Sequence, residues 1–294
     1  MKVLVTGAGG QLGRDLVQAF AEVAPGVGDL VAIEHGNLDV ADEVAVRQAV
    51  DAYRPEVVVN AAAWTDVDAC EADPARAHRV NALGPWWLAR ACQRQGARLI
   101  TVSTDYVFPG VAPLDGAGQP RGWSEFDPVA PVNVYGRSKA AGEQLVRASL
   151  PEHHIVRTAW MSGARGRNFV ATMLRLGRER GAVTVVDDQI GSPTYARDLA
   201  AAIVELAGSD RFGTWHRTNT GHCSWRDLAV ATFELAGMDV EVARQPSSAL
   251  DRPAPRPAWS VLDQTHAHAA GFSVLPHWRD GLARLLAELG ARAV

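Results

Sequence analysis

A tyrosine and a lysine four residues apart are the first candidates for chemistry. Tyr135-Gly136-Arg137-Ser138-Lys139 begins a stretch, residues 135–148, whose pattern predicts a helix, and side chains at i and i+4 project from one helix face. An ammonium about 4 Å from a phenol, at an effective dielectric near 20, is worth about 4 kcal/mol, or about three pKa units. We expect Lys139 to lower the pKa of Tyr135 and make it a general acid near neutral pH. A surface helix turn is the alternative.

A cluster of polar residues follows a predicted strand at residues 98–102. The string Ser103-Thr104-Asp105-Tyr106-Val107-Phe108 stands where ligands bind in parallel sheets, at the carboxyl end of a strand. The hydroxyl of Thr104 can donate to a developing alkoxide and share that role with Tyr135. Serine, threonine and aspartate also suit turns, so a plain turn cluster is the alternative.

A glycine loop lies near the start of the chain. Gly7, Gly10 and Gly13 follow an apolar run and open an amphipathic stretch that includes Gln11 and Leu12. Glycines let the backbone approach a phosphate pair closely, and the helix N-terminus presents free N–H groups. The spacing predicts a dinucleotide site, and Lys139 would then bind ribose hydroxyls of the cofactor. Alone, the spacing also fits a tight turn.

The residues after the second predicted strand bear on the adenosine end of that cofactor. Glu34 could accept hydrogen bonds from a ribose 2′-OH, whereas Arg14 could attract a 2′-phosphate. The choice between NADH and NADPH therefore stays open. Asp39 and Val40, which end the string Asn37-Leu38-Asp39-Val40, are expected near the adenine.

The elements that must position these residues alternate along the chain. Predicted strands at residues 2–6, 30–33, 57–60, 98–102 and 154–157 alternate with predicted helices at 11–23, 41–53, 71–95 and 135–148. This alternation predicts an α/β fold of Rossmann type, a doubly wound parallel sheet with a smaller C-terminal substrate-binding lobe. Pro85 should bend or split the helix at 71–95.

The domain division follows from the same pattern. Residues 1–158 are expected to form a dinucleotide-binding domain, to which some later segments return, and residues 159–294 mostly a substrate-binding lobe. A strand at 183–186 and a helix at 198–207 are predicted there. Residues 245–259 carry four prolines and should be mostly loop.

Composition excludes several classes of protein. Of 294 residues, 47% are hydrophobic and 21% charged, and the net charge of −4 offers no basic footprint for nucleic acid. Three distant cysteines fit free thiols in a reducing compartment better than disulfides. The apolar N-terminal run is too short for a signal peptide or membrane span. We expect a cytoplasmic protein with no membrane or nucleic-acid partner.

Together, these motifs resemble those of the extended short-chain dehydrogenase/reductases and, within them, the dTDP-4-dehydrorhamnose reductases. The resemblance runs almost end to end and includes further strings: residues 60–68, 157–160 and 187–194, and the pair Arg256-Pro257. It implies reduction of the C4 ketone of a dTDP-linked 4-keto-6-deoxyhexose by hydride from NADPH or NADH, giving dTDP-L-rhamnose or a close relative.

The resemblance also assigns roles to residues. It implies that Thr104, Tyr135 and Lys139 are catalytic. The remaining residues that it implicates are, for the cofactor, Ala61, Ala62 and Ala63, and, for the nucleotide-sugar, Thr65, Val67, Asp105, Trp160, Asn168 and Arg256. An arginine fork at Arg256 suits a diphosphate.

Departures from related patterns narrow the expectation. A 4,6-dehydratase of this superfamily carries an Asp-Glu pair after the threonine, but here Tyr106 takes the second place, so dehydration is not expected. Some of these reductases bind magnesium between subunits through glutamates. The matching places here carry Arg197 and Arg279, and Asp15 alone makes no site. We therefore expect no metal, and a monomer or a dimer that no metal bridges.

Two other functions remain open. One is a related nucleotide-sugar ketoreductase or epimerase, such as one that makes dTDP-dihydrostreptose. The other is a non-catalytic regulatory subunit of the same fold.

Overall fold

The computed structural model describes residues 1–23 and 29–291. Its centre is a six-stranded parallel sheet in the order β10-β5-β4-β3-β1-β2. The strands are β1 (Lys2–Thr6), β2 (Asp29–Ile33), β3 (Val57–Asn60), β4 (Arg98–Thr104), β5 (His153–Thr158) and β10 (Gly213–His216). Buried runs rich in valine and leucine suit a sheet that is covered on both faces. The strand order reverses between β1 and β3, which places a crevice at the carboxyl ends of these strands.

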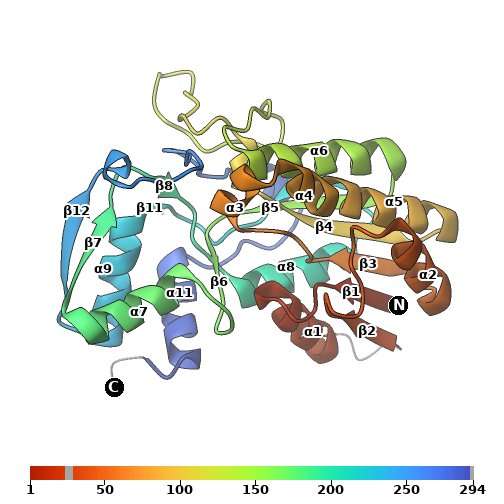
Figure 1. Ribbon diagram of the computed structural model, residues 1–294, viewed down its shortest axis with the longest axis horizontal. Coiled ribbons are helices and arrows are strands. Elements are labelled where there is room, and N and C mark those ends of the chain that lie inside the picture. Colours follow the sequence, from red (N-terminus) through yellow and green to blue (C-terminus); the bar gives the residue numbers. More distant parts are fainter. Residues whose placement is uncertain (24–28, 292–294) are drawn as a thin grey trace.

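Helices cover both faces of this sheet (Figure 1). One face packs against α1 (Gln11–Val23) and α8 (Ala196–Ala207), through side chains such as Leu16 and Ile203. The other packs against α2 (Glu43–Tyr53) and α5 (Gly84–Gln95), with Val146 from α6 (Val134–Ser149) in the same core. The expected doubly wound α/β fold is confirmed. Both β10 and α8 come from beyond residue 158. They add an edge strand and a covering helix to the sheet that the first half of the chain forms.

The predicted helix at 71–95 is divided into several segments, and one of the boundaries lies next to Pro85. It is divided into α3 (Val67–Ala72), α4 (Pro74–His78), a π-helical segment (Arg79–Leu83) and α5. The Asp73 carboxylate accepts a hydrogen bond from the Arg76 N–H and so begins α4 as a cap. The π-helical segment ends at Leu83, which is still helical, and α5 begins at the next residue, Gly84, with Pro85 in its first turn. Pro85 lacks an N–H at this boundary, so the expectation that Pro85 bends or splits this helix is confirmed.

The rest of the chain forms a second layer of elements, on the left in Figure 1. Its helices are α7 (Phe169–Arg180), α9 (Trp225–Ala236) and α11 (Trp278–Glu288), and β7 (Ala182–Val186) pairs in parallel with β12 (Glu241–Gln245). The short helix α10 (Thr265–Ala269) instead packs against β10 in the core of the central sheet. Two small ladders join β6 (Met161–Ser162) to β9 (Thr194–Tyr195) and β8 (Ile190–Gly191) to β11 (Cys223–Ser224). The proline-rich stretch contains one 3₁₀ turn (Ser247–Ala249) and is otherwise irregular.

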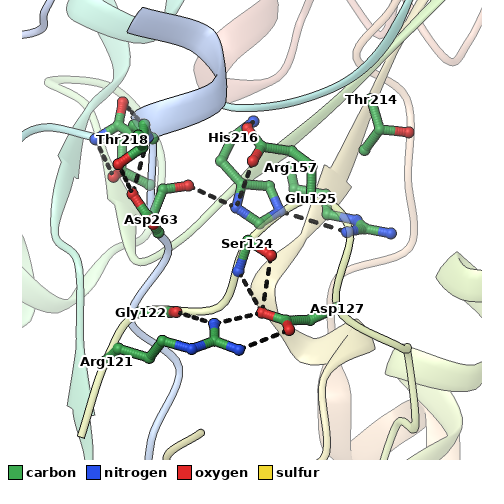
Figure 2. A network of polar contacts seen from close by, with 12 residues as sticks. Arg121, Gly122, Ser124, Glu125, Asp127, Arg157, Thr214, His216, Thr218 and Asp263 are labelled. Atoms are coloured by element: carbon green, nitrogen blue, oxygen red, sulfur yellow. Dashed lines mark hydrogen bonds and ion pairs between the residues drawn. The ribbon is translucent and has the colours of Figure 1, made fainter. Parts of the chain in front are cut away.

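A long connection leads from β4, through a 3₁₀ turn (Asp105–Val107), to α6 and projects beyond that helix in Figure 1. Figure 2 shows how its base is held. The guanidinium of Arg121 binds both oxygens of Asp127 at 2.6 and 2.8 Å, and Glu125 Oε1 accepts from the backbone N–H of His216 at 2.9 Å. His216 in turn contacts Arg157. The connection is therefore tied to the end of β10 and to β5.

Candidate active site

A cleft of about 1090 Å³ lies at the carboxyl ends of the central strands. It brings together twelve of the residues singled out from the sequence. These are Gly10, Gln11, Leu12, Ala61, Ala62, Ala63, Thr65, Thr104, Asp105, Tyr135, Lys139 and Trp160. The cleft is the crevice in which Rossmann-type sheets bind their ligands.

The glycine loop packs too tightly for any side chain at two of its positions. A Cβ on Gly13 would lie 2.1 Å from the carbonyl oxygen of Gly7, and one on Gly7, whose φ is +71°, would lie 2.7 Å from the Ala62 nitrogen. Helix α1 begins at Gln11, and Gly10, Gln11 and Leu12 line the cleft. The free N–H groups of the first turn of this helix therefore lie at the cleft. The loop fits a dinucleotide pyrophosphate at a helix N-terminus.

Both candidates for ribose recognition lie against the outer side of this loop. The carboxylate of Glu34 sits so close to Gly9 that a Cβ there would be 3.0 Å from its Cδ. The Nε of Arg14 donates to the Gly9 carbonyl oxygen at 3.0 Å. An acid and a base share this position, which leaves the choice between the two cofactors as open as the sequence did.

Helix α6 places the tyrosine and lysine pair in the cleft. Its cap is Asn133, whose Oδ1 accepts from the Gly136 N–H at 2.8 Å. Tyr135 follows in the first turn and Lys139 one turn later, and both line the cleft with Thr104. The Nζ of Lys139 donates to the Val102 carbonyl oxygen at 2.7 Å. A phenol, an ammonium and a hydroxyl therefore converge on one space.

Burial, not the lysine, governs the pKa of Tyr135. Burial raises that pKa, and the nearby Thr104 hydroxyl only partly offsets the rise. Burial also lowers the pKa of Lys139 to about 8, against the opposing charge of Glu143. The expected lowering of the tyrosine pKa was wrong, because burial disfavours the phenolate, and the Thr104 hydroxyl, not Lys139, is the group that acts against this rise. Tyr135 keeps its proton near neutral pH and can donate it.

The carboxyl of Asp105 lies beside the hydroxyl of Thr104. Thr104 Oγ1 donates to Asp105 Oδ1 at 2.9 Å and accepts from the Tyr106 N–H at 3.2 Å, while Asp105 Oδ2 is buried and accepts no hydrogen bond from the described residues. Burial raises the pKa of Asp105 to about 7. Two hydroxyls, Ser260 and Thr104, act in the opposite direction, although that of Ser260 is directed at the Ile190 carbonyl oxygen at 3.5 Å. The cleft thus holds a carboxyl that titrates near neutral pH.

A buried carboxylate that sequence reasoning missed lies one turn beyond the lysine. Glu143 accepts from Ser103 Oγ at 2.6 Å, from Arg157 at 2.9 and 2.7 Å, and from Arg147 at 2.8 Å. Its spacing of four from Lys139, on the inward face of α6, was the signal that could have found it. The carboxylate ties α6 to β4 and β5 beneath the cleft.

A second pocket of about 980 Å³ holds Arg256, which the sequence had assigned to the nucleotide-sugar. Arg256 Nη2 lies 2.8 Å from Asp68 Oδ2, and its Nη1 donates to the Ala254 carbonyl oxygen at 2.7 Å. The pocket adjoins the cleft through Tyr106, which follows Asp105 and stacks edge-on against Tyr135 at 5.7 Å. The other residues that line this pocket, among them Arg252, Gln189, Trp225 and Tyr106, had no site role assigned from the sequence.

Several residues that the sequence assigned to the cofactor or substrate do not line the cleft and make structural contacts instead. Asn168 caps α7 by accepting from the Ala171 N–H, and its Nδ2 donates to Gln11 Oε1 at 3.0 Å. Asp39 accepts from the Ala41 N–H, and Val40 packs against Gly84. Three more, Gly7, Gly13 and Val67, do not line either pocket. Arg167, in contrast, lines the cleft and was missed.

The residues considered for a metal separate into two places. Arg279 Nη2 pairs with Glu234 at 2.8 Å. Arg197 Nη2 binds Glu288 Oε1 at 2.8 Å, and its Nε lies 3.9 Å from Asp15 Oδ1. Burial, with the charge of Glu288, raises the pKa of Asp15 to about 6. Glu288, which the sequence analysis did not consider, is the residue that joins Asp15 and Arg197.

Two absences concern the described residues alone. Residues 1–23 and 29–291 contain no group of three or more histidine, cysteine, aspartate or glutamate side chains arranged to hold a metal ion. Within the same residues, no helix has the length and apolar character to cross a membrane.

Comparisons with known proteins agree with this geometry. A dTDP-4-dehydrorhamnose reductase of Streptomyces griseus is 48% identical over 297 residues, covering 99% of this chain and 94% of that protein. One from Mycobacterium tuberculosis H37Rv is 46% identical over 289 residues, covering 97% and 92%. The crystal structure of dTDP-4-dehydrorhamnose reductase from Bacillus anthracis in complex with NADP superposes with a TM-score of 0.91 at 41% identity, covering 98% of this chain and all of that one. Residues 1–291 match the family described as RmlD substrate binding domain, and the chain belongs to that family.

Proposed function

We propose that this protein reduces the C4 keto group of dTDP-4-dehydro-L-rhamnose (dTDP-4-dehydro-6-deoxy-L-mannose) to dTDP-L-rhamnose, using NADPH or NADH. The observation that carries the proposal is the convergence of Thr104, Tyr135 and Lys139 in a cleft beside the glycine loop. The names of the relatives and the NADP complex of the Bacillus anthracis enzyme support the substrate and the cofactor.

The chain's own residues fit a dinucleotide. The loop of Gly7, Gly10 and Gly13, with Gln11 and Leu12, would hold the pyrophosphate, and Asp39 and Val40 would lie toward the adenine. Ala61, Ala62 and Ala63 present small side chains along the cleft, and Lys139 would bind the ribose hydroxyls. When bound, the reduced cofactor supplies a hydride to C4 of the sugar. By this proposal residues 1–158 hold the cofactor and residues 159–294 mostly the substrate.

Proton transfer falls to Tyr135. As the hydride reaches C4, the C4 oxygen gains negative charge and takes the phenolic proton, which leaves an alcohol. The Thr104 hydroxyl would donate to the same oxygen and stabilise the developing charge. The protonated state of Tyr135 near neutral pH, which burial favours, is the state that this step needs.

The two pockets suit the two halves of a nucleotide-sugar. Arg256, with Arg252 beside it, would bind the diphosphate in the second pocket. Thr65, Asp105 and Trp160, which line the cleft, would surround the sugar. Asn168 would act on this site through its hydrogen bond to Gln11.

Other parts of the proposal concern the cell and the assembly. The cytoplasm is the proposed compartment, since its reducing conditions keep thiols such as Cys70, Cys92 and Cys223 free. The proposed assembly is a monomer or a dimer without a bridging metal.

The test is a direct assay with the purified full chain. NADPH or NADH is mixed with the dTDP-4-keto sugar, the absorbance of the reduced cofactor is followed, and the sugar product is identified by NMR. Oxidation with formation of dTDP-L-rhamnose is the expected result. No oxidation would favour the non-catalytic subunit instead. A product of different configuration would favour a related ketoreductase, an outcome that a 41% identical dTDP-4-keto-6-deoxy-D-glucose reductase of Streptomyces niveus makes worth checking.

A further inference from the structure

The backbone of Trp160 has an unfavourable conformation. Its φ is +46°, in the left-handed region, and only one other described residue besides glycines, Arg54, has a positive φ. A bulky residue in that region costs about 1–3 kcal/mol and persists only where its surroundings hold it. Trp160 follows the end of β5 and precedes β6, so this conformation turns the chain from the central sheet toward the second layer of elements.

Two contacts hold the indole of Trp160. The indole of Trp225 stacks on it with ring centroids 3.5 Å apart and planes at 4°. Gly191 touches it as well, because a Cβ there would lie 2.3 Å from one indole carbon of Trp160. The ladder of β8 and β11 brings both contacts to one place, since Cys223 pairs with Gly191 and Trp225 follows two residues later.

Trp225 is itself fixed firmly. Ser224 and Asp227 form a capping box that begins α9 at Trp225. Trp225 Nε1 donates to Gln189 Oε1 at 3.1 Å, and Gln189 Nε2 donates to Ser247 Oγ at 2.7 Å. A fixed indole can impose its orientation on a strained neighbour.

The stacked pair also stands between the two pockets. Trp160 lines the cleft that holds Thr104 and Tyr135, whereas Trp225 lines the pocket that holds Arg252 and Arg256. The two stacked indoles therefore each form part of the wall of a different pocket, Trp160 in the cleft and Trp225 in the second pocket.

We propose that Trp225 is a positioning residue for the sugar: it holds Trp160 in its left-handed conformation, so that the indole of Trp160 forms the wall against which the keto-deoxyhexose ring is placed for reduction. The inference rests on the proposed function. It adds that a residue bordering the nucleotide pocket sets the geometry at the sugar. Gly191 serves the same end by leaving room for the indole.

A double-mutant cycle tests this in the full chain. Trp160→Ala and Trp225→Ala are made singly and together, and kcat/KM for the dTDP-4-keto sugar is measured with saturating NADPH. Because Trp225 acts through Trp160, we expect each single variant to lose about tenfold or more, and the double variant to lose little beyond Trp160→Ala. Losses that multiply in the double variant would overturn the inference.

Conservative and unrelated variants separate positioning from folding. Trp225→Phe keeps an aromatic stack and should recover most of kcat/KM, while Gly191→Ala, which crowds the indole, should resemble Trp225→Ala. The Kd for NADPH should stay within about twofold in all of these variants. Trp86→Phe is the matched control, since Trp86 packs against Trp87 in α5, lines neither pocket, and should leave the kinetics unchanged. Failure of Trp225→Phe to recover activity would count against the stack.

A crystal structure of Trp225→Ala tests the role of Trp225 independently of the proposed function. If the wild-type chain oxidises no NADPH with the dTDP-4-keto sugar, the proposed function fails, and the conformation of Trp160 in the variant still answers the question. Release of Trp160 from the left-handed region or displacement of its indole supports the inference. An unchanged Trp160 overturns it.

Discussion

Arg157, in β5, binds both carboxylate oxygens of Glu143, with Nε 2.9 Å from Oε1 and Nη2 2.7 Å from Oε2. Both side chains are 2% exposed, so the pair is almost wholly removed from water. Arg157 also contacts His216, through which the network of Figure 2 reaches the connection between β4 and α6. The pair therefore joins the helix that carries Tyr135 and Lys139 to the sheet that carries Thr104.

Removing the charge of Glu143 should destabilise the fold. Glu143→Gln leaves the Arg157 guanidinium buried without its counter-charge, and breaking such a pair costs about 3–5 kcal/mol. Urea unfolding measures the loss. Arg147→Gln is the matched control, because this partner is 37% exposed and its i,i+4 pair with Glu143 is worth about 0.3–0.5 kcal/mol. A loss below about 1 kcal/mol in Glu143→Gln would contradict the role of the buried pair.

Removing the phenolic proton should slow turnover while sparing the cofactor. Tyr135→Phe keeps the ring that packs against Tyr106 but cannot donate a proton, so kcat should fall by about 10²–10⁴-fold. Steady-state kinetics give kcat, and fluorescence titration with NADPH gives a Kd that should stay near the wild-type value. Tyr53→Phe, on the exposed end of α2, is the control. Undiminished turnover in Tyr135→Phe would remove the phenol from the mechanism.

The charge of Lys139 should limit activity at alkaline pH. Burial holds its pKa at about 8, below the ordinary 10.5, so the ammonium is lost as pH rises through about 8. The pH profile of kcat/KM reports the free enzyme, and it should fall above that pH while Tyr135 is still protonated. Lys139→Arg keeps a charge at all these pH values and should remove the alkaline fall, though at lower activity. A fall that persists in Lys139→Arg belongs to another group.

Asp105 should make stability decrease as pH rises toward neutrality. Its pKa is raised from 3.8 to about 7, so between these values the folded state holds a proton that the unfolded state has lost. The free energy of unfolding therefore falls with rising pH in that window, and Asp105→Asn should remove this contribution. Urea unfolding at pH 5 and pH 8 compares the two proteins.

The control for that comparison is Asp127→Asn. The Arg121 guanidinium holds the pKa of Asp127 below its ordinary range, so this carboxylate stays charged throughout the window. The difference between wild type and Asp127→Asn should be the same at both pH values. A difference for Asp105→Asn that is equally constant would show that Asp105 does not titrate there.

Local patterns carried the fold and the centre of the site. The strands are recognisable in the sequence as short apolar runs such as Val57–Asn60. Position 13 requires a glycine because a Cβ there would clash with the carbonyl oxygen of Gly7, six residues earlier. Tyr135 and Lys139 share a helix face because of their spacing, and Thr104 ends its strand. Each of these properties depends on residues a few positions apart, which is why the sequence alone revealed them.

Only the tertiary structure decided what depends on distant segments. Arg256 meets Asp68 in a separate pocket, Trp160 meets Trp225, and Glu143 is enclosed by arginines. No periodicity encodes such contacts, because each joins elements that are separate along the chain: α3 with the proline-rich stretch, the segment after β5 with α9, and α6 with β5. The rise in the pKa of Tyr135 has the same origin, since the depth of burial, and not the spacing to Lys139, sets the cost of charging the phenol.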